Sequence, residues 1–122
     1  MMQMKDKVFL DSNILVYCYS TSDIDKLKIA RTLTLKENVF ISTQVLNETI
    51  NVLSKKYHIS WVNLVGLVDN FENNFNIHTL SSVEIKNGCN IAEKYGFSFY
   101  DSLIISSALK CNCNILKPEF DY

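Results

Sequence analysis

The sequence predicts an α/β protein in which a short parallel sheet is sandwiched between helices. Short apolar runs alternate with longer segments of helical periodicity throughout the 122 residues. The apolar runs lack the alternation of polar and apolar residues that is typical of a strand with one solvent-exposed face. This indicates strands covered by helices on both faces. Hydrophobic residues make up 48% and charged residues 20%, as in folded globular chains, so we expect a single domain over residues 1–122.

Four apolar segments are expected to form the strands. The first, KVFLD, is followed at once by Ser12 and Asn13, both good helix N-caps. Pro118 follows the last segment and stops it, because proline has no N–H to donate to a neighbouring strand. In chain order, the strands are predicted at residues 7–11, 39–41, 76–80 and 114–116.

The segments around the strands have helical periodicity and helix-capping residues. Ser42 or Thr43, Ser60 and Ser98 are placed as N-caps, and Gly96 is a natural residue just beyond a helix end. In chain order, helices are predicted from Ser12 or Asn13 through residues 14–19, and over 24–36, 43–57, 60–74, 82–95 and 99–110.

Charge and hydropathy exclude several classes of protein. The net charge of −1 argues against a protein that binds nucleic acid by general electrostatic attraction, although an enzyme that holds its substrate through a metal and a few lysines remains compatible. No apolar run approaches the ~20 residues of a membrane span, and no secretory signal is present, so we expect a cytoplasmic protein. In that reducing compartment the four cysteines are expected to be free thiols.

Three acidic residues are predicted to meet at one edge of the sheet. Asp11 lies where the first strand ends, Glu48 in the second turn of the helix after the second strand, and Asp101 in the first turn of the helix before the last strand. In open parallel sheets the active site lies beyond the carboxyl ends of the strands. Each acid alone also has a structural explanation: a helix N-cap for Asp11, a solvent-facing position for Glu48, and a capping box with Ser98 for Asp101.

Clustered carboxylates repel each other and raise one another's pKa values. A hard divalent cation relieves this repulsion, and Mg²⁺ accepts a few carboxylate oxygens while it retains several waters. A metal-bound water can attack a phosphodiester while the metal stabilises charge on the phosphate oxygens. The sequence therefore predicts a metal-dependent phosphodiesterase site.

Three sequence motifs resemble those of PIN domains, particularly the VapC-type toxins of bacterial toxin–antitoxin pairs. VFLDSN at 8–13 resembles the first motif, STQVLNET at 42–49 the second, and GFSFYDSLIISSAL at 96–109 the third. Their order and spacing cover nearly the whole chain. The resemblance implies a three-layer α/β/α sandwich, a Mg²⁺ or Mn²⁺ site, an RNA substrate, a homodimer and a small antitoxin partner.

The resemblance also implies roles for individual residues. It makes Asp11, Glu48 and Asp101 the catalytic and metal-binding acids, with Asn13 and Ser12 supporting the site. The family's fourth acid is expected just after the last motif strand, where this chain reads NILKPEFDY. Simple register puts Phe120 at that position, so Glu119 or Asp121, on either side of it, is the possible fourth acid.

Two other functions compete with a toxin-type endoribonuclease. The incomplete tail favours a truncated or decayed toxin that keeps the PIN-like fold as a binding module, and metal-dependent cleavage of RNA separates the two. The other alternative is phosphoryl transfer with Asp11 as a covalent nucleophile. That chemistry usually uses a DxD motif, and Asn13 stands where its second Asp would be.

Overall fold

The structure is a computed structural model that describes residues 6–20, 22–36 and 38–117. Within this part of the chain, four short strands form one sheet in the order β3-β2-β1-β4, and every neighbouring pair is parallel. The strands are β1 (Val8–Leu10), β2 (Val39–Ser42), β3 (Asn76–His78) and β4 (Ile115–Lys117).

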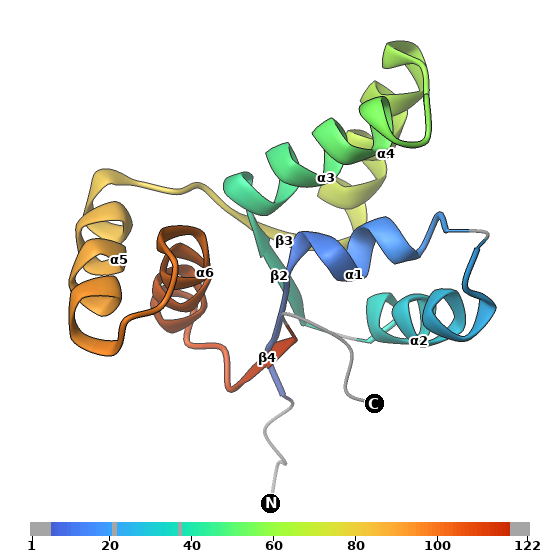
Figure 1. Ribbon diagram of the computed structural model, residues 1–122. Helices are drawn as coiled ribbons and strands as arrows, with labels where there is room; N and C mark the ends of the chain where they lie inside the picture. Colours follow the sequence, from blue (N-terminus) through green and yellow to red (C-terminus); the bar gives the residue numbers. More distant parts are fainter. Residues whose placement is uncertain (1–5, 21, 37, 118–122) are drawn as a thin grey trace, which may run out of the picture.

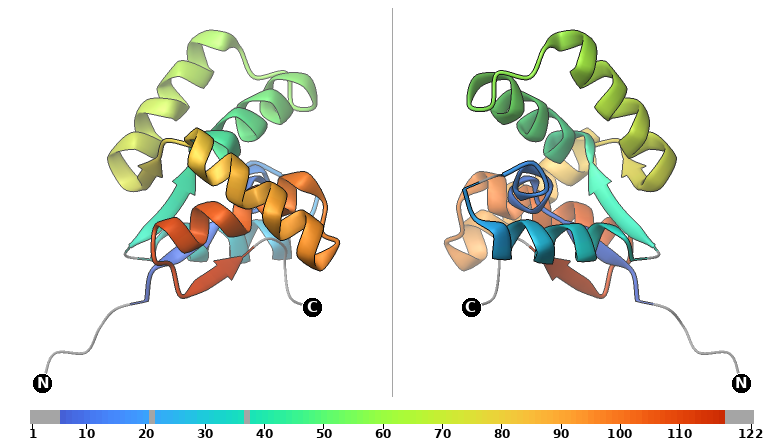
Figure 2. Two further views of the ribbon diagram at one scale, coloured as in Figure 1. Left: turned by 90° about the vertical axis from the view of Figure 1, so that its left-hand side faces the viewer. Right: turned by 90° about the vertical axis from the view of Figure 1, so that its right-hand side faces the viewer.

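Helices cover both faces of this sheet. Figure 1 shows α5 and α6 on one side of the strands and α1 and α2 on the other, with α3 and α4 forming a hairpin that projects beyond them. The two views of Figure 2 show the opposite faces, one fronted by α5 and α6 and the other by α1 and α2. The helices are α1 (Ser12–Tyr17), α2 (Ile24–Thr34), α3 (Thr43–Lys55), α4 (Trp61–Asn74), α5 (Ser82–Tyr95) and α6 (Phe99–Lys110). The predicted three-layer α/β class is confirmed.

The core lies around the two central strands. Phe9 and Leu10 of β1 and Ile41 of β2 are fully buried, as expected for strands with helices on both faces. Because all four strands are parallel, their carboxyl ends lie at the same edge of the sheet. Asp11 directly follows β1 at this edge, and α3 directly follows β2.

Most helix boundaries follow from the expected caps. Side chains of Ser42, Ser60 and Ser98 each accept a hydrogen bond from a backbone N–H three residues on. Gly96 has a φ of 73°, a left-handed conformation that suits glycine and ends α5. The prediction that Ser12 or Asn13 caps the first helix is wrong: the cap is Asp11, and Ser12 is already helical.

A buried carboxylate fixes the segment between β3 and α5. Glu84 of α5 is only 1% exposed, and its Oε1 lies 2.5 Å from His78 Nε2 at the end of β3. The Ser81 hydroxyl also donates to Glu84. Burial raises the pKa of Glu84, but hydrogen bonds from its own backbone N–H, His78 and Ser81 outweigh burial and lower the pKa overall. The segment is also tied to α3, because the Leu80 N–H donates to the Thr43 hydroxyl.

The described helices include none that is both long enough and apolar enough to cross a membrane.

Candidate active site

Asp11 occupies the junction between β1 and α1. Its backbone N–H donates to the Lys117 carbonyl at 3.2 Å, which continues the pairing of β1 with β4. Its carboxylate accepts the Ser12 N–H at 2.6 Å and so caps α1. The side chain is therefore held half-buried at the carboxyl edge of the sheet. Capping explains the local geometry, but the surroundings of the carboxylate indicate a further role.

Glu48 is held next to Asp11 by two hydrogen bonds. The Ser12 hydroxyl donates to Glu48 Oε2 at 3.0 Å, and Gln44 Nε2 donates to Glu48 Oε1 at 2.9 Å. Ser12 is 8% exposed and Gln44 is 9% exposed, so both donors are almost entirely shielded from water. The Ser12 hydroxyl also lies 3.4 Å from Asp11 Oδ1 and thus links the two acids. The orientation of Glu48 is fixed before any ligand binds.

Asp101 approaches the same edge from the opposite layer. It lies in the first turn of α6, where its backbone N–H donates to the Ser98 hydroxyl at 3.2 Å. This hydrogen bond uses the backbone and leaves the carboxylate exposed. The fold thus brings one acid from α3 and another from α6 toward Asp11.

The pKa of Asp11 is raised chiefly by burial, with a further contribution from the neighbouring acids. Burial raises the pKa of Asp11 above its ordinary value, and the negative charges of Glu48 and Asp101 raise it further. Hydrogen bonds from the Ser12 N–H and hydroxyl act in the opposite direction but do not cancel the rise. No lysine or arginine in the described part of the chain forms an ion pair with any of the three carboxylates. Among the described residues, their mutual repulsion is therefore not offset by an ion pair with a lysine or arginine.

The donor set fits a hard divalent cation, which prefers carboxylate oxygens and tolerates water as its remaining ligands. Asp11 and Glu48 supply two such groups, and Asp101 is exposed and near enough to affect the Asp11 pKa. Across residues 6–20, 22–36 and 38–117, however, no three His, Cys, Asp or Glu side chains are already gathered closely enough to hold an ion. The sharing of one ion by all three acids therefore stays a prediction.

The supporting residues differ in part from those expected. The Ser12 hydroxyl donates to Glu48, and its supporting role at the site stays a prediction. The Asn13 side chain is exposed and makes no hydrogen bond to any other residue that the structure describes. Gln44 was missed, although its spacing of four residues from Glu48 places the two side chains on one helical face. Glu119 and Asp121 lie outside the described residues, but Lys117, the last described residue, is hydrogen-bonded to Asp11.

The protein is therefore an α/β protein whose Asp11, Glu48 and Asp101 form an acidic site beyond the carboxyl edge of a parallel sheet. The chain belongs to the PIN domain family, whose family model matches residues 8–121. No curated protein gives a significant match to the sequence.

Two solved structures support the same fold. One is the VapC20 toxin of Mycobacterium tuberculosis, described as a sarcin–ricin loop cleaving toxin. It has a TM-score of 0.74 and 16% identity, over 94% of this chain and 90% of that protein. The other is a toxin–antitoxin complex from Klebsiella pneumoniae, with a TM-score of 0.66 and 18% identity, over 89% of this chain and 83% of that one. At these identities the likeness concerns the fold.

Proposed function

We propose that this protein is a metal-dependent endoribonuclease and the toxin of a type II toxin–antitoxin pair. The observation that carries the proposal is that Glu48 and Asp101 lie near enough to Asp11 to raise its pKa, in a member of the PIN domain family. The similarity to a toxin described as cleaving the sarcin–ricin loop supports RNA as the substrate class.

In this proposal Asp11, Glu48 and Asp101 hold one Mg²⁺ or Mn²⁺ ion. When bound, the ion supplies a water activated for attack and stabilises charge on the phosphodiester oxygens. Ser12 and Gln44 act on Glu48, because their hydrogen bonds fix both of its oxygens. Groups of this kind orient ligands and influence metal affinity without touching the ion. The buried position of both donors keeps water from competing for these bonds.

Cleavage of RNA by the purified protein tests the proposal. We expect fragments from single-stranded or structured RNA in the presence of Mg²⁺ or Mn²⁺, and none after the metal is removed with EDTA. Asp11→Asn should lower the cleavage rate at least about 100-fold, since losing a direct ligand should exceed the 10–100-fold effect of losing a supporting group. Equal cleavage by Asp11→Asn and the wild type, in the same metal, would refute the site assignment.

A non-catalytic binding protein is the second candidate. It is favoured by the lack of a preformed three-ligand group in the part of the chain that the structure describes, and by the exposed position of Asp101. It predicts binding of RNA or of a protein partner without any metal-dependent cleavage. The same cleavage experiment therefore separates the two functions.

We further propose a small antitoxin as partner and a homodimer as the assembled state. The Klebsiella pneumoniae neighbour is a toxin–antitoxin complex, which supports an antitoxin partner. The first half of α4 exposes apolar side chains that an antitoxin segment or a second copy would cover: Trp61 is 68%, Val62 83% and Val65 63% exposed. A small upstream gene for a DNA-binding protein would support the pairing.

A further inference from the structure

A cleft of about 800 Å³ opens directly beside the acidic site. Three parts of the fold form it: the start of α3, the segment after β3, and the start of α6. Glu48 belongs to both the acidic site and the cleft wall. Tyr100, on another wall, immediately precedes Asp101 in the chain. A molecule in the cleft therefore lies next to the proposed cleavage position.

The walls of the cleft differ in chemistry. The α3 wall is polar and presents Thr43 and Asn47 beside Glu48. The α6 wall is more apolar, and is formed by Leu103, which is buried, and Tyr100, which is 63% exposed. The Phe99 ring lies 5.7 Å from the Tyr100 ring, centroid to centroid, in a tilted arrangement. A flat ring with polar edges matches such a cleft, because one face can stack while the edge forms hydrogen bonds.

Asn47 is the amide available to a ligand on the polar wall. Its side chain is exposed and makes no hydrogen bond to another described residue. Its neighbour Gln44 is not equivalent, because that side chain is buried and donates to Glu48. An asparagine amide both donates and accepts, as the edge of a nucleobase does. The Thr43 hydroxyl already accepts the Leu80 N–H, which fixes the third side of the cleft.

The charge of the protein strengthens the argument for a base in this cleft. With a net charge of −1, the chain gains little from the counterion release that drives most binding to the phosphate backbone. Contacts that do not depend on phosphate charge would therefore add usefully to those made by a metal and a few lysines. Stacking of a base on an aromatic side chain is the main contact of this kind, and every base provides it.

We propose that this cleft holds one unpaired RNA base beside the cleaved phosphodiester, with Tyr100 stacking on the base and Asn47 contacting its edge. The inference rests on the proposed nuclease function and assigns that function a base-binding subsite. A base within a duplex is stacked and paired, so the subsite selects single-stranded or flipped-out nucleotides. Tyr100 and Asn47 thus contribute to substrate choice, whereas the acids serve cleavage.

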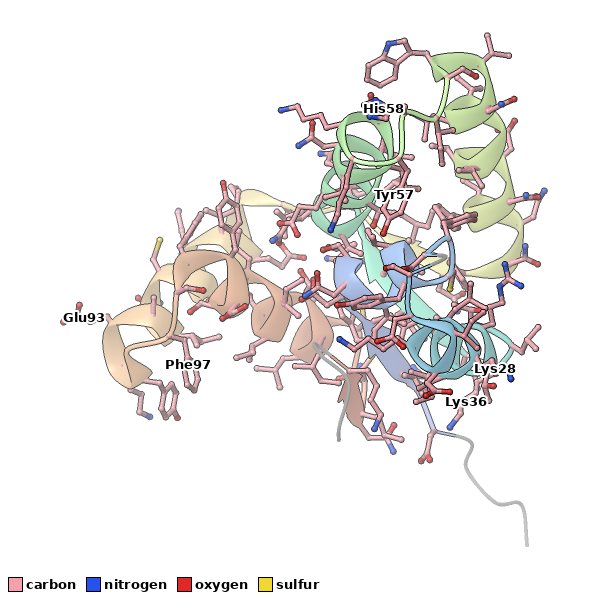
Figure 3. All side chains as sticks on the ribbon, turned by 45° about the vertical axis from the view of Figure 1, so that its right-hand side comes forward. Lys28, Lys36, Tyr57, His58, Glu93 and Phe97 are labelled. Atoms are coloured by element: carbon pink, nitrogen blue, oxygen red, sulfur yellow. The ribbon has the colours of Figure 1, made fainter. Side chains whose placement is uncertain are left out.

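Equilibrium binding tests the subsite separately from cleavage. The probes are an adenosine RNA of about ten nucleotides, the same length with abasic riboses throughout, and the adenosine RNA paired with its complement. Binding is measured in EDTA at low ionic strength, so that neither metal nor cleavage contributes. The variants are Tyr100→Leu, Tyr100→Phe and Asn47→Ala, with Phe97→Leu as the matched control. Phe97 is also an exposed aromatic residue but does not line the cleft, and Figure 3 shows it on the α5–α6 pair, away from the α3–α4 hairpin.

We expect the wild type to bind the adenosine RNA about tenfold more tightly than the abasic or the paired RNA. Tyr100→Leu should lose most of that preference, while Tyr100→Phe and Phe97→Leu keep it. Asn47→Ala should reduce differences in affinity among RNAs of different bases but keep the preference over abasic RNA. Thermal unfolding of each variant shows whether it is folded.

Several results would overturn the subsite. They are equal wild-type affinity for the adenosine and abasic RNAs, undetectable binding of all three probes, or a Tyr100→Leu protein that keeps the full preference. Metal-dependent cleavage by the wild type is measured in parallel. Cleavage without a Tyr100-dependent preference refutes the subsite and leaves the nuclease intact. A Tyr100-dependent preference without cleavage refutes the nuclease and leaves a base-binding site.

Discussion

Asp11 is destabilised in its charged form, because burial and two nearby carboxylates all oppose ionisation. Its folded-state pKa is raised from 3.8, so the folded protein holds this proton more tightly than the unfolded chain does. As pH rises from the unfolded-state value through the folded-state value, ionisation of Asp11 therefore lowers the free energy of unfolding. Above the folded-state pKa, this reduction in the free energy of unfolding no longer changes with pH.

Asp11→Asn should for this reason stabilise the metal-free protein at neutral pH. Asparagine caps a helix as well as aspartate does, so the α1 cap is kept while the repulsion is lost. The stability difference between variant and wild type should widen as pH rises through the Asp11 pKa. Thermal unfolding in EDTA across acidic to neutral pH measures it. A variant less stable than the wild type at pH 7 in EDTA would contradict the electrostatic argument.

Ser12 is predicted to act on metal binding through Glu48. Ser12→Ala removes the hydroxyl that donates to Glu48 Oε2, which should weaken Mn²⁺ binding about tenfold or more. Ser20→Ala is the matched control, because Ser20 is also buried but its hydroxyl pairs with that of Ser22. Calorimetric titration with Mn²⁺ compares the two variants. Equal affinity of Ser12→Ala and the wild type would exclude this positioning role.

The positions of Asp11 and Glu48 at one edge of the sheet were predictable from the sequence, but only some of their hydrogen-bond partners were. Asp11 and Glu48 could be predicted to lie close together because each follows a parallel strand. Ser12 could be predicted as a supporting residue because it belongs to the first motif. Gln44 could not be singled out in advance, because a glutamine in the first turn of a helix is usually solvated. Only the burial of this position on α3 turns its amide into a fixed donor to Glu48.

At the scale of elements, strand and helix order was predictable and helix ends were less so. The second helix ends at Thr34 and the third at Lys55, short of the expected 36 and 57. His58, beyond α3, has a φ of 55°, a left-handed conformation that no sequence signal indicated. Figure 3 shows Tyr57 and His58 at the end of α3 that lies farthest from the sheet. The pairing of His78 with buried Glu84 also depends on tertiary packing that the pattern of 82–95 does not encode.

The segment after β4 is predicted to contribute to the site. Lys117 is hydrogen-bonded to Asp11, so the chain leaves β4 beside the acids. We expect the double variant Glu119→Gln, Asp121→Asn to bind Mn²⁺ more weakly than the wild type without losing binding, as for a group outside the direct ligand set. Asp6→Asn is the control, since Asp6 precedes β1 at the other edge of the sheet. Calorimetry that finds unchanged affinity in the double variant would exclude the tail from the site.

The exposed start of α4 is predicted to receive the antitoxin. Trp61→Ala removes a large apolar side chain that is 68% exposed, and it should weaken binding of the cognate antitoxin about tenfold or more, as for a buried aromatic anchor at an interface. Val83→Ala on α5 is the control, at 57% exposure and on the opposite side of the sheet. Binding is measured on proteins of verified fold and oligomeric state. Unchanged affinity in Trp61→Ala would place the antitoxin elsewhere.

At the scale of the whole molecule, the topology explains why residues far apart in the sequence form one site. The strand order β3-β2-β1-β4 returns the chain across the sheet after β3, which puts α5 and α6 on the face opposite α1 and α2. Asp101 therefore reaches the carboxyl edge from one face, while Glu48 reaches it from α3. The same arrangement opens the cleft between α3 and α6. The parallel pairing of the strands allowed us to predict which edge of the sheet holds the acids. The cleft could not be predicted, because it depends on how the helices pack.

Titration of the protein with Mn²⁺, followed by paramagnetic broadening of its backbone amide NMR signals, tests the central claim most directly. We expect broadening to begin at the amides around Asp11, Glu48 and Asp101 and to saturate with one ion per chain. Asp11→Asn should abolish this local pattern and retain the fold. Broadening centred elsewhere in the molecule, or an identical pattern in Asp11→Asn, would contradict a shared metal site at the carboxyl edge of the sheet.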